Sequence, residues 1–120
     1  MEKRSKQNSE KNTKSEYSYG FSPLAMRDID EALSYIAGEL LNPAAASDLY
    51  DKIFASIDIC RLFPYGIPDC SVYGLSDPSY RHKKIDNYVL FFKICEDEKK
   101  LWIVRFLYSA RDIHSDFLIK

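Results

Sequence analysis

The chain has 120 residues, of which 46% are hydrophobic and 14% aromatic, and its formal net charge is −1. This length suits one domain with one sizeable core and leaves no room for two. Three cysteines without a CxxC spacing argue against a disulfide framework or a zinc site, and the absence of a signal-peptide pattern or a roughly 20-residue apolar run leads us to expect a cytoplasmic protein with no membrane partner.

The first 15 residues are polar, mixed in charge and without periodicity. Such a segment buries too little apolar surface to offset the entropy of ordering it. We therefore predict a disordered tail over residues 1–15 and one domain over residues 16–120. The domain begins with a half-buried strand, because Tyr17, Tyr19 and Phe21 alternate with small residues.

Two amphipathic helices are predicted next, over residues 24–41 and 43–62. Each follows a side chain that can cap a helix and a proline that suits its first turn, at Ser22-Pro23 and Asn42-Pro43. The link between the two helices is one or two residues long, so they must fold back as a hairpin. The expected buried stripes are Met26, Ile29, Leu33, Ile36 and Leu40 in the first helix, and Leu49, Ile53, Ile57 and Cys60 in the second.

From residue 79 the hydrophobic period changes from 3.6 to 2, which predicts strands over residues 80–85, 88–95 and 101–109. Short turns at 86–87 and 96–100 would join them into a meander. The predicted fold class is α+β: an antiparallel β-sheet, formed by the N-terminal strand and the three-stranded meander, covered on one face by an α-helical hairpin.

Charge is distributed unevenly along the chain. Residues 24–63 hold three basic and seven acidic residues, whereas residues 79–111 hold eight basic and four acidic ones. The basic half could meet a negatively charged partner. Alternatively, the two halves could attract each other or be solvated separately, and the charges alone leave these interpretations open.

The basic half combines cations with tyrosine, which is a set that phosphodiester cleavage can use. A guanidinium can stabilise charge on a phosphorane, and a phenol beside arginines can transfer a proton. Alternation along the last strand would place Trp102, Val104, Phe106 and Tyr108 on one face, and Ile103, Arg105, Leu107 and Ser109 on the other. One face would lie under the helices and the other could carry several cations. The competing interpretation is that these charges only keep a sheet soluble and that Tyr108 belongs to the core.

Metal and cofactor chemistry is not indicated. Neither His82 nor His114 has a second histidine or a cysteine at ligand spacing, and no glycine-rich phosphate-binding motif occurs. We expect no metal and no cofactor.

Residues 80–113 (YRHKKIDNYVLFFKICEDEKKLWIVRFLYSARDI) resemble the C-terminal half of RelE/ParE-type toxins. The shared order is an arginine-containing strand, a short turn, a tyrosine-led apolar strand, an acidic turn and an apolar strand followed by Arg-Asp. The front half agrees, with FSPLAMRDIDEALSYI at the first helix, LLNPAAA at the helix junction and Phe-Pro after the second helix. The resemblance covers about residues 17–116.

This resemblance implies the toxin of a bacterial type II toxin–antitoxin module, associated with plasmid stabilisation and held inactive by a cognate antitoxin. One branch of such toxins cleaves mRNA in the ribosome, and the other inhibits DNA gyrase without known hydrolysis. Carried over by position, Arg81 and Arg111 would stabilise the phosphorane and Tyr108 would transfer the proton. The expected substrate-binding residues are Lys83, Lys84 and Arg105.

A ribosome-dependent mRNA endoribonuclease is the first hypothesis for this chain. Ribonuclease members often have arginine directly after the strand tyrosine, where this chain has Val89, and the region after the tail is net acidic. Both departures leave two alternatives open: a non-enzymatic gyrase inhibitor of the ParE type, or an inactive toxin-fold interaction module.

Overall fold

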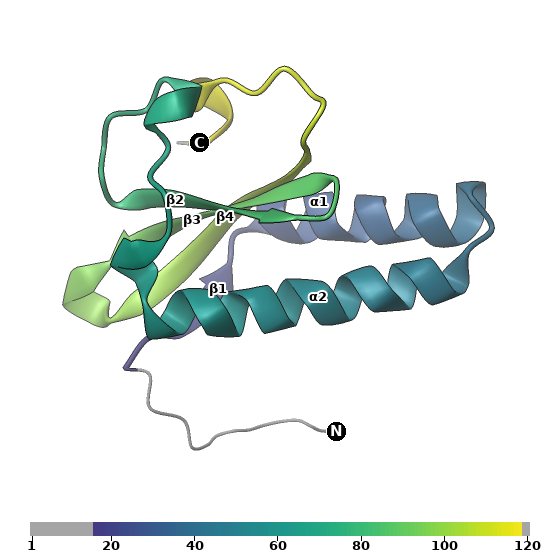
Figure 1. Cartoon of the computed structure of the whole chain (residues 1–120), viewed down its shortest axis with the longest axis horizontal. Coiled ribbons are helices and arrows are strands. Elements are labelled where there is room, and N and C mark those ends of the chain that lie inside the picture. The colour runs from purple at the N-terminus through teal and green to yellow at the C-terminus, as the bar shows by residue number, and fades with distance from the viewer. Residues whose placement is uncertain (1–15, 119–120) are drawn as a thin grey trace.

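The computed structural model describes residues 16–118, so the predicted tail over residues 1–15 lies outside the described residues. Two α-helices and a four-stranded sheet make up the regular structure of that region (Figure 1). In chain order the elements are β1 (Ser18–Phe21), α1 (Pro23–Ser34), α2 (Pro43–Leu62), β2 (Tyr80–Ile85), β3 (Tyr88–Cys95) and β4 (Lys100–Tyr108). The α+β class and the helical hairpin are as predicted.

The sheet is mixed rather than antiparallel. Its strand order is β1-β4-β3-β2, with β2–β3 and β3–β4 antiparallel and β1 parallel to β4. The predicted antiparallel sheet is therefore wrong for β1. Alternating aromatic residues indicate that a strand forms there, but they carry no information about its neighbour or its direction. The helical hairpin and two intervening strands return the chain so that β4 runs beside β1 in the same direction.

Both helices begin where the capping pattern predicts. The Ser22 hydroxyl accepts a hydrogen bond from the Ala25 amide at 3.0 Å, and the Asn42 side-chain oxygen accepts one from the Ala45 amide at 3.1 Å. The first helix was predicted to continue to Leu41, but α1 ends at Ser34 and a π-helical turn follows over Tyr35–Glu39. This turn is wider than an α-helical one, and turns of this kind are frequent at functional sites.

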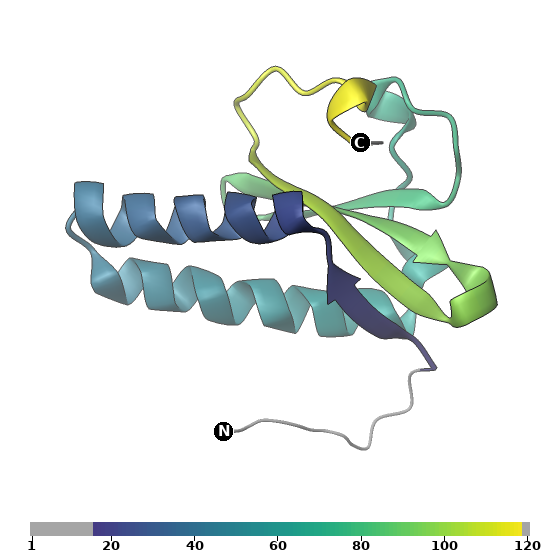
Figure 2. The ribbon, with the colours of Figure 1, turned by 180° about the vertical axis from the view of Figure 1, so that it is seen from behind.

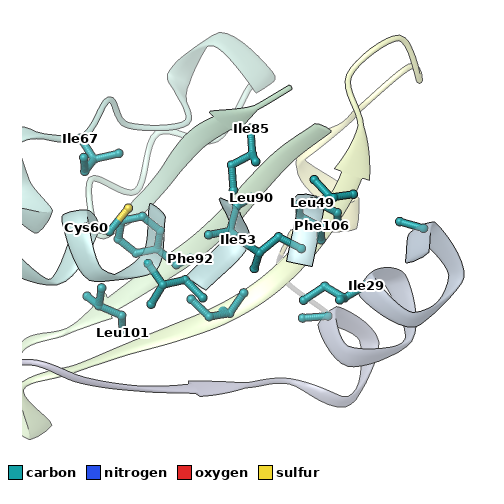
Figure 3. Close-up of a cluster of buried hydrophobic side chains, with 14 of the residues drawn as sticks. Ile29, Leu49, Ile53, Cys60, Ile67, Ile85, Leu90, Phe92, Leu101 and Phe106 are labelled. Atoms are coloured by element: carbon teal, nitrogen blue, oxygen red, sulfur yellow. The ribbon is translucent and has the colours of Figure 1, made fainter. Parts of the chain in front are cut away.

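The main core lies between the helical hairpin and one face of the sheet. Figure 3 shows Ile29, Leu49 and Ile53 of the helices pointing toward Leu90 and Phe106 of the sheet. Two members of the predicted stripe of the first helix do not belong to this core, since Met26 and Leu40 are each 55% exposed. Ala25 and Ala32 are buried instead, because small side chains let α1 approach the sheet closely.

The second face of the sheet is also covered by apolar side chains. It holds a separate buried cluster formed by Cys70, Tyr80, Val89, Phe91, Val104, Leu107 and Leu118. Residues 70–75 of the loop before β2 lie over this face together with the C-terminal segment, on the side away from α2 (Figures 1 and 2). The expectation that this face could carry several cations is therefore wrong for most of its area.

A β-bulge changes which side chains of β4 share a face. Phe91 is paired with Arg105 but its neighbour Phe92 is paired with Ile103, so Val104 is an extra residue in β4. After the bulge, Phe106 packs in the helix-side core and Leu107 in the second cluster. The predicted grouping of Phe106 and Tyr108 with Trp102 and Val104 is wrong, because an inserted residue moves the side chains that follow it to the opposite face.

One carboxylate ties three distant segments together at the β3–β4 turn. Glu96 accepts hydrogen bonds from the hydroxyls of Tyr17 at 2.8 Å and Tyr65 at 2.9 Å, and it pairs with Lys99. The bonds from Lys99 and from the two hydroxyls lower the pKa of Glu96 from 4.5 to about 2.

This depressed pKa predicts a stability difference that depends on pH. A carboxyl group whose pKa is lower in the folded chain stabilises it above the unfolded pKa, and that contribution is lost as pH falls toward the folded pKa. We expect Glu96→Gln to lower the melting temperature near pH 6, with the gap from the wild-type chain closing between pH 4.5 and pH 2. Thermal unfolding at several pH values measures this. Glu98→Gln in the same turn is the matched control and should follow the wild-type curve; a gap that stays constant with pH would contradict the assignment.

Candidate functional site

A cavity of about 710 Å³ opens where the first helix ends beside the sheet. Its walls come from α1, the π-helical turn, the start of α2, the β2–β3 turn and the adjoining ends of β3 and β4. The lining residues are Asp28, Glu31, Ala32, Tyr35, Ile36, Leu40, Asn42, Ala45, Asn87, Tyr88, Phe106, Leu107, Tyr108 and Arg111. We call this cavity the tyrosine groove, after Tyr35, Tyr88 and Tyr108.

The β3–β4 register sets the aromatic wall of the tyrosine groove. Tyr88 is paired with Tyr108 across these two strands. The Tyr88 ring stacks on Phe106 at 4.9 Å with the two planes 9° apart, and it meets the Tyr108 ring edge-on at 5.7 Å. Burial raises the pKa of the Tyr88 hydroxyl, and the neighbouring Tyr108 and Tyr35 raise it further. Tyr108 is 51% exposed, so it is not a core residue.

Arg111 lines the same groove as Tyr108. Its backbone amide donates to the Tyr108 carbonyl at 3.1 Å, which closes the turn after β4. Its guanidinium lies over the Phe117 ring, 4.8 Å from the centroid. The structure thus brings together two of the three residues predicted to be catalytic.

Arg81, the third of them, lies elsewhere. Its guanidinium donates hydrogen bonds to the backbone carbonyls of Pro78 at 2.8 Å, Tyr65 at 3.1 Å and Ile67 at 2.9 Å. On β3, Arg81 is paired with Phe92, whereas Tyr108 is paired with Tyr88. These two positions are four residues apart on β3, which separates them by about 13 Å along the strand. Arg81 holds the loop before β2 against the sheet and does not reach the tyrosine groove.

The three residues predicted to bind substrate are also dispersed. Arg105 donates to both carboxylate oxygens of Asp28, at 2.7 and 3.0 Å, and this bond is the main reason that its pKa is raised. Lys83 lies on the helix-facing side of β2, near the buried thiol of Cys60. Lys84 is exposed and, by strand alternation, points to the opposite side. None of the three lines the tyrosine groove.

Several residues that line the groove were not among the predicted site residues. Tyr35 is 52% exposed, and Leu40, predicted to lie in the buried stripe, is 55% exposed. For Tyr88 the sequence predicts only the start of an apolar strand. The available signal was Tyr35, which falls outside the apolar stripe of the first helix. A large exposed aromatic at a helix end, next to a tight helix junction, is a reasonable marker for a binding surface.

A family model described as "ParE toxin of type II toxin-antitoxin system, parDE" matches residues 19–113. The chain belongs to this ParE toxin family. The match runs from within β1 to beyond the end of β4 and includes both helices, so the resemblance to RelE/ParE-type toxins noted from the sequence is confirmed.

One solved structure supports this fold. The chain is similar to one from P. aeruginosa described as a chromosomal ParDE toxin–antitoxin system, with a TM-score of 0.61 and 15% identity over 77% of this chain and 95% of that one. It also matches one from Mycobacterium tuberculosis described as the toxin–antitoxin complex RelBE2, with a TM-score of 0.49 and 16% identity over 77% of this chain and 96% of that one. No curated protein sequence matches the chain. Within residues 16–118, none of the helices is long and apolar enough to cross a membrane.

Proposed function

We propose that this ParE family toxin arrests bacterial growth in the cytoplasm by binding DNA gyrase, without chemical catalysis, and that a cognate antitoxin holds it inactive. Membership of the ParE toxin family of type II toxin–antitoxin systems supports both the toxin role and the antitoxin partner. In this proposal the tyrosine groove, with its exposed Tyr35 and Tyr108, is the contact surface for a protein partner.

The bonding of Arg81 is the observation that favours contact over catalysis. Phosphodiester cleavage by Arg81, Tyr108 and Arg111 would need all three side chains around one phosphate, with donors at hydrogen-bond distance from the developing charge. Arg81 instead donates to three backbone carbonyls at another part of the sheet. Moving it would break all three hydrogen bonds, of which the one to the Ile67 carbonyl is partly buried and the other two are exposed to water.

A ribosome-dependent mRNA endoribonuclease is the second candidate function. It is favoured by one observation, that Tyr108 and Arg111 line the same open groove. In that mechanism Tyr108 would transfer the proton and Arg111 would stabilise the phosphorane. Lys83, Lys84 and Arg105 would not assist, because they do not line the groove.

Expression of the chain without an antitoxin in a bacterial host tests the proposal. We expect growth arrest in which plasmid DNA loses negative supercoiling before protein synthesis declines. The matched control is Arg81→Ala. If the chain acts by contact, this variant should remain toxic when it is as abundant in the cell as the wild-type chain. Protein synthesis that stops first, with mRNA cleaved in ribosomes and supercoiling intact, would establish the ribonuclease instead.

A further inference from the structure

We propose that the tyrosine groove binds an arginine side chain presented by a protein partner. This inference rests on the proposed function in one respect, namely that the groove is a contact surface for a protein partner. It follows from three features of the groove: its aromatic faces, its unpaired acceptors and the carboxylate of Glu31.

The aromatic faces suit a planar cation. Tyr88 and Tyr108 meet at 69°, which leaves their rings as two sides of a corner rather than one flat stack. Tyr35 faces the same cavity from the end of the first helix. A guanidinium stacks well against such rings, both through its plane and through its attraction to the electron-rich ring face.

Unpaired oxygen acceptors surround this corner. Within residues 16–118, the hydroxyls of Tyr35, Tyr88 and Tyr108 make no hydrogen bond with the protein. Each phenol oxygen can therefore accept a bond from a ligand. A guanidinium carries five N–H donors in a fixed plane and has no acceptor of its own, so it matches a site that offers acceptors on several sides.

One lining carboxylate, that of Glu31, can also attract a cation in the groove. The Asp28 carboxylate is already neutralised by Arg105, and the Arg111 guanidinium lies over Phe117, toward the C-terminal segment. Glu31 is then the acidic lining residue without an ion pair among residues 16–118. The helical segment that contains Glu31 ends at Glu39, and α2 begins at Pro43 on the same side of the groove, so the opposite partial charges of these two helix ends offset each other.

Titration with N-acetyl-arginine amide, followed by NMR, tests the inference on the full chain. We expect chemical-shift changes confined to residues that line the groove. The neutral isostere N-acetyl-citrulline amide should bind about fivefold more weakly, because it keeps the hydrogen-bond donors but loses the cation–π and charge attractions. Glu31→Gln should weaken arginine binding by a few fold. Asp30→Asn, which removes a carboxylate from the same helix outside the groove, should leave it unchanged.

The inference would be overturned by equal binding of the arginine and citrulline probes, by an unchanged affinity in Glu31→Gln, or by chemical-shift changes that map outside the groove. If Glu31→Gln folds poorly, Tyr108→Leu tests the inference in its place. This variant removes one aromatic ring from the groove and should weaken binding of the arginine probe more than binding of the citrulline probe. Loss of arginine binding in a chain that still inhibits gyrase would overturn this inference alone. Arginine binding in a chain with no effect on gyrase would instead count against the proposed function.

Discussion

Replacing Arg105 by methionine should lower the free energy of unfolding by about 3 kcal/mol, because it leaves a buried carboxylate without its counter-ion. The side chain of Asp28 is only 8% exposed, and that of Arg105 is 14% exposed. Asp28 also accepts a hydrogen bond from the Phe106 amide at 3.0 Å, directly after the β-bulge. Arg105 further donates to the Phe117 carbonyl at 3.3 Å, so the pair joins α1, β4 and the C-terminal segment.

Urea denaturation of the wild-type and variant chains measures this loss. Lys84→Met removes an exposed cation from the same sheet and should change stability by no more than about 0.5 kcal/mol. Adding Asp28→Asn to Arg105→Met should recover part of the loss, since a neutral amide oxygen can still accept from the Phe106 amide and no charge is then buried. An Arg105→Met variant as stable as Lys84→Met would show that the pair is not structural.

Tyr108→Phe is the variant for which the two candidate functions predict the most different losses of activity. It keeps the ring that packs against Tyr88 but removes the hydroxyl. A nuclease that uses this hydroxyl for proton transfer should cleave roughly 100-fold more slowly. The contact mechanism predicts that the concentration needed for half-inhibition of gyrase changes by less than about threefold, because one exposed hydroxyl contributes little to a protein interface.

The matched control for Tyr108→Phe is Tyr50→Phe, since both tyrosines are 51% exposed and Tyr50 lies on α2 outside the groove. Assays of mRNA cleavage and of supercoiling should be run on both variants. A 100-fold loss confined to Tyr108→Phe would identify a catalytic tyrosine and exclude the contact mechanism.

Local signals in the sequence predicted the elements of this fold well. Capping side chains at Ser22 and Asn42 place the starts of both helices, and the change of period after residue 79 predicts the meander. What local patterns do not contain is pairing between distant segments. The parallel direction of β1, the second apolar cluster under the C-terminal segment and the bulge at Val104 all depend on such pairing.

The candidate site was only partly predictable for the same reason. Tyr108 and Arg111 are close in sequence, so their meeting at one groove follows from a single turn. The family resemblance places Arg81 with them, and charge places Arg105 with them. The structure instead pairs Arg81 with backbone carbonyls before β2 and Arg105 with Asp28, and each of these partners is distant in sequence. A cation in a sequence therefore becomes a candidate catalytic residue only once its own bonding partners are known.

Inhibition of purified DNA gyrase by the purified full chain is the most direct test of the contact mechanism. Supercoiling of relaxed plasmid should fall as the chain is titrated in, with no mRNA cleavage when the same preparation is added to translating ribosomes. Addition of the cognate antitoxin should restore supercoiling. Undiminished supercoiling at a large excess of the chain, together with cleavage of ribosome-bound mRNA, would contradict the proposed function and establish the endoribonuclease in its place.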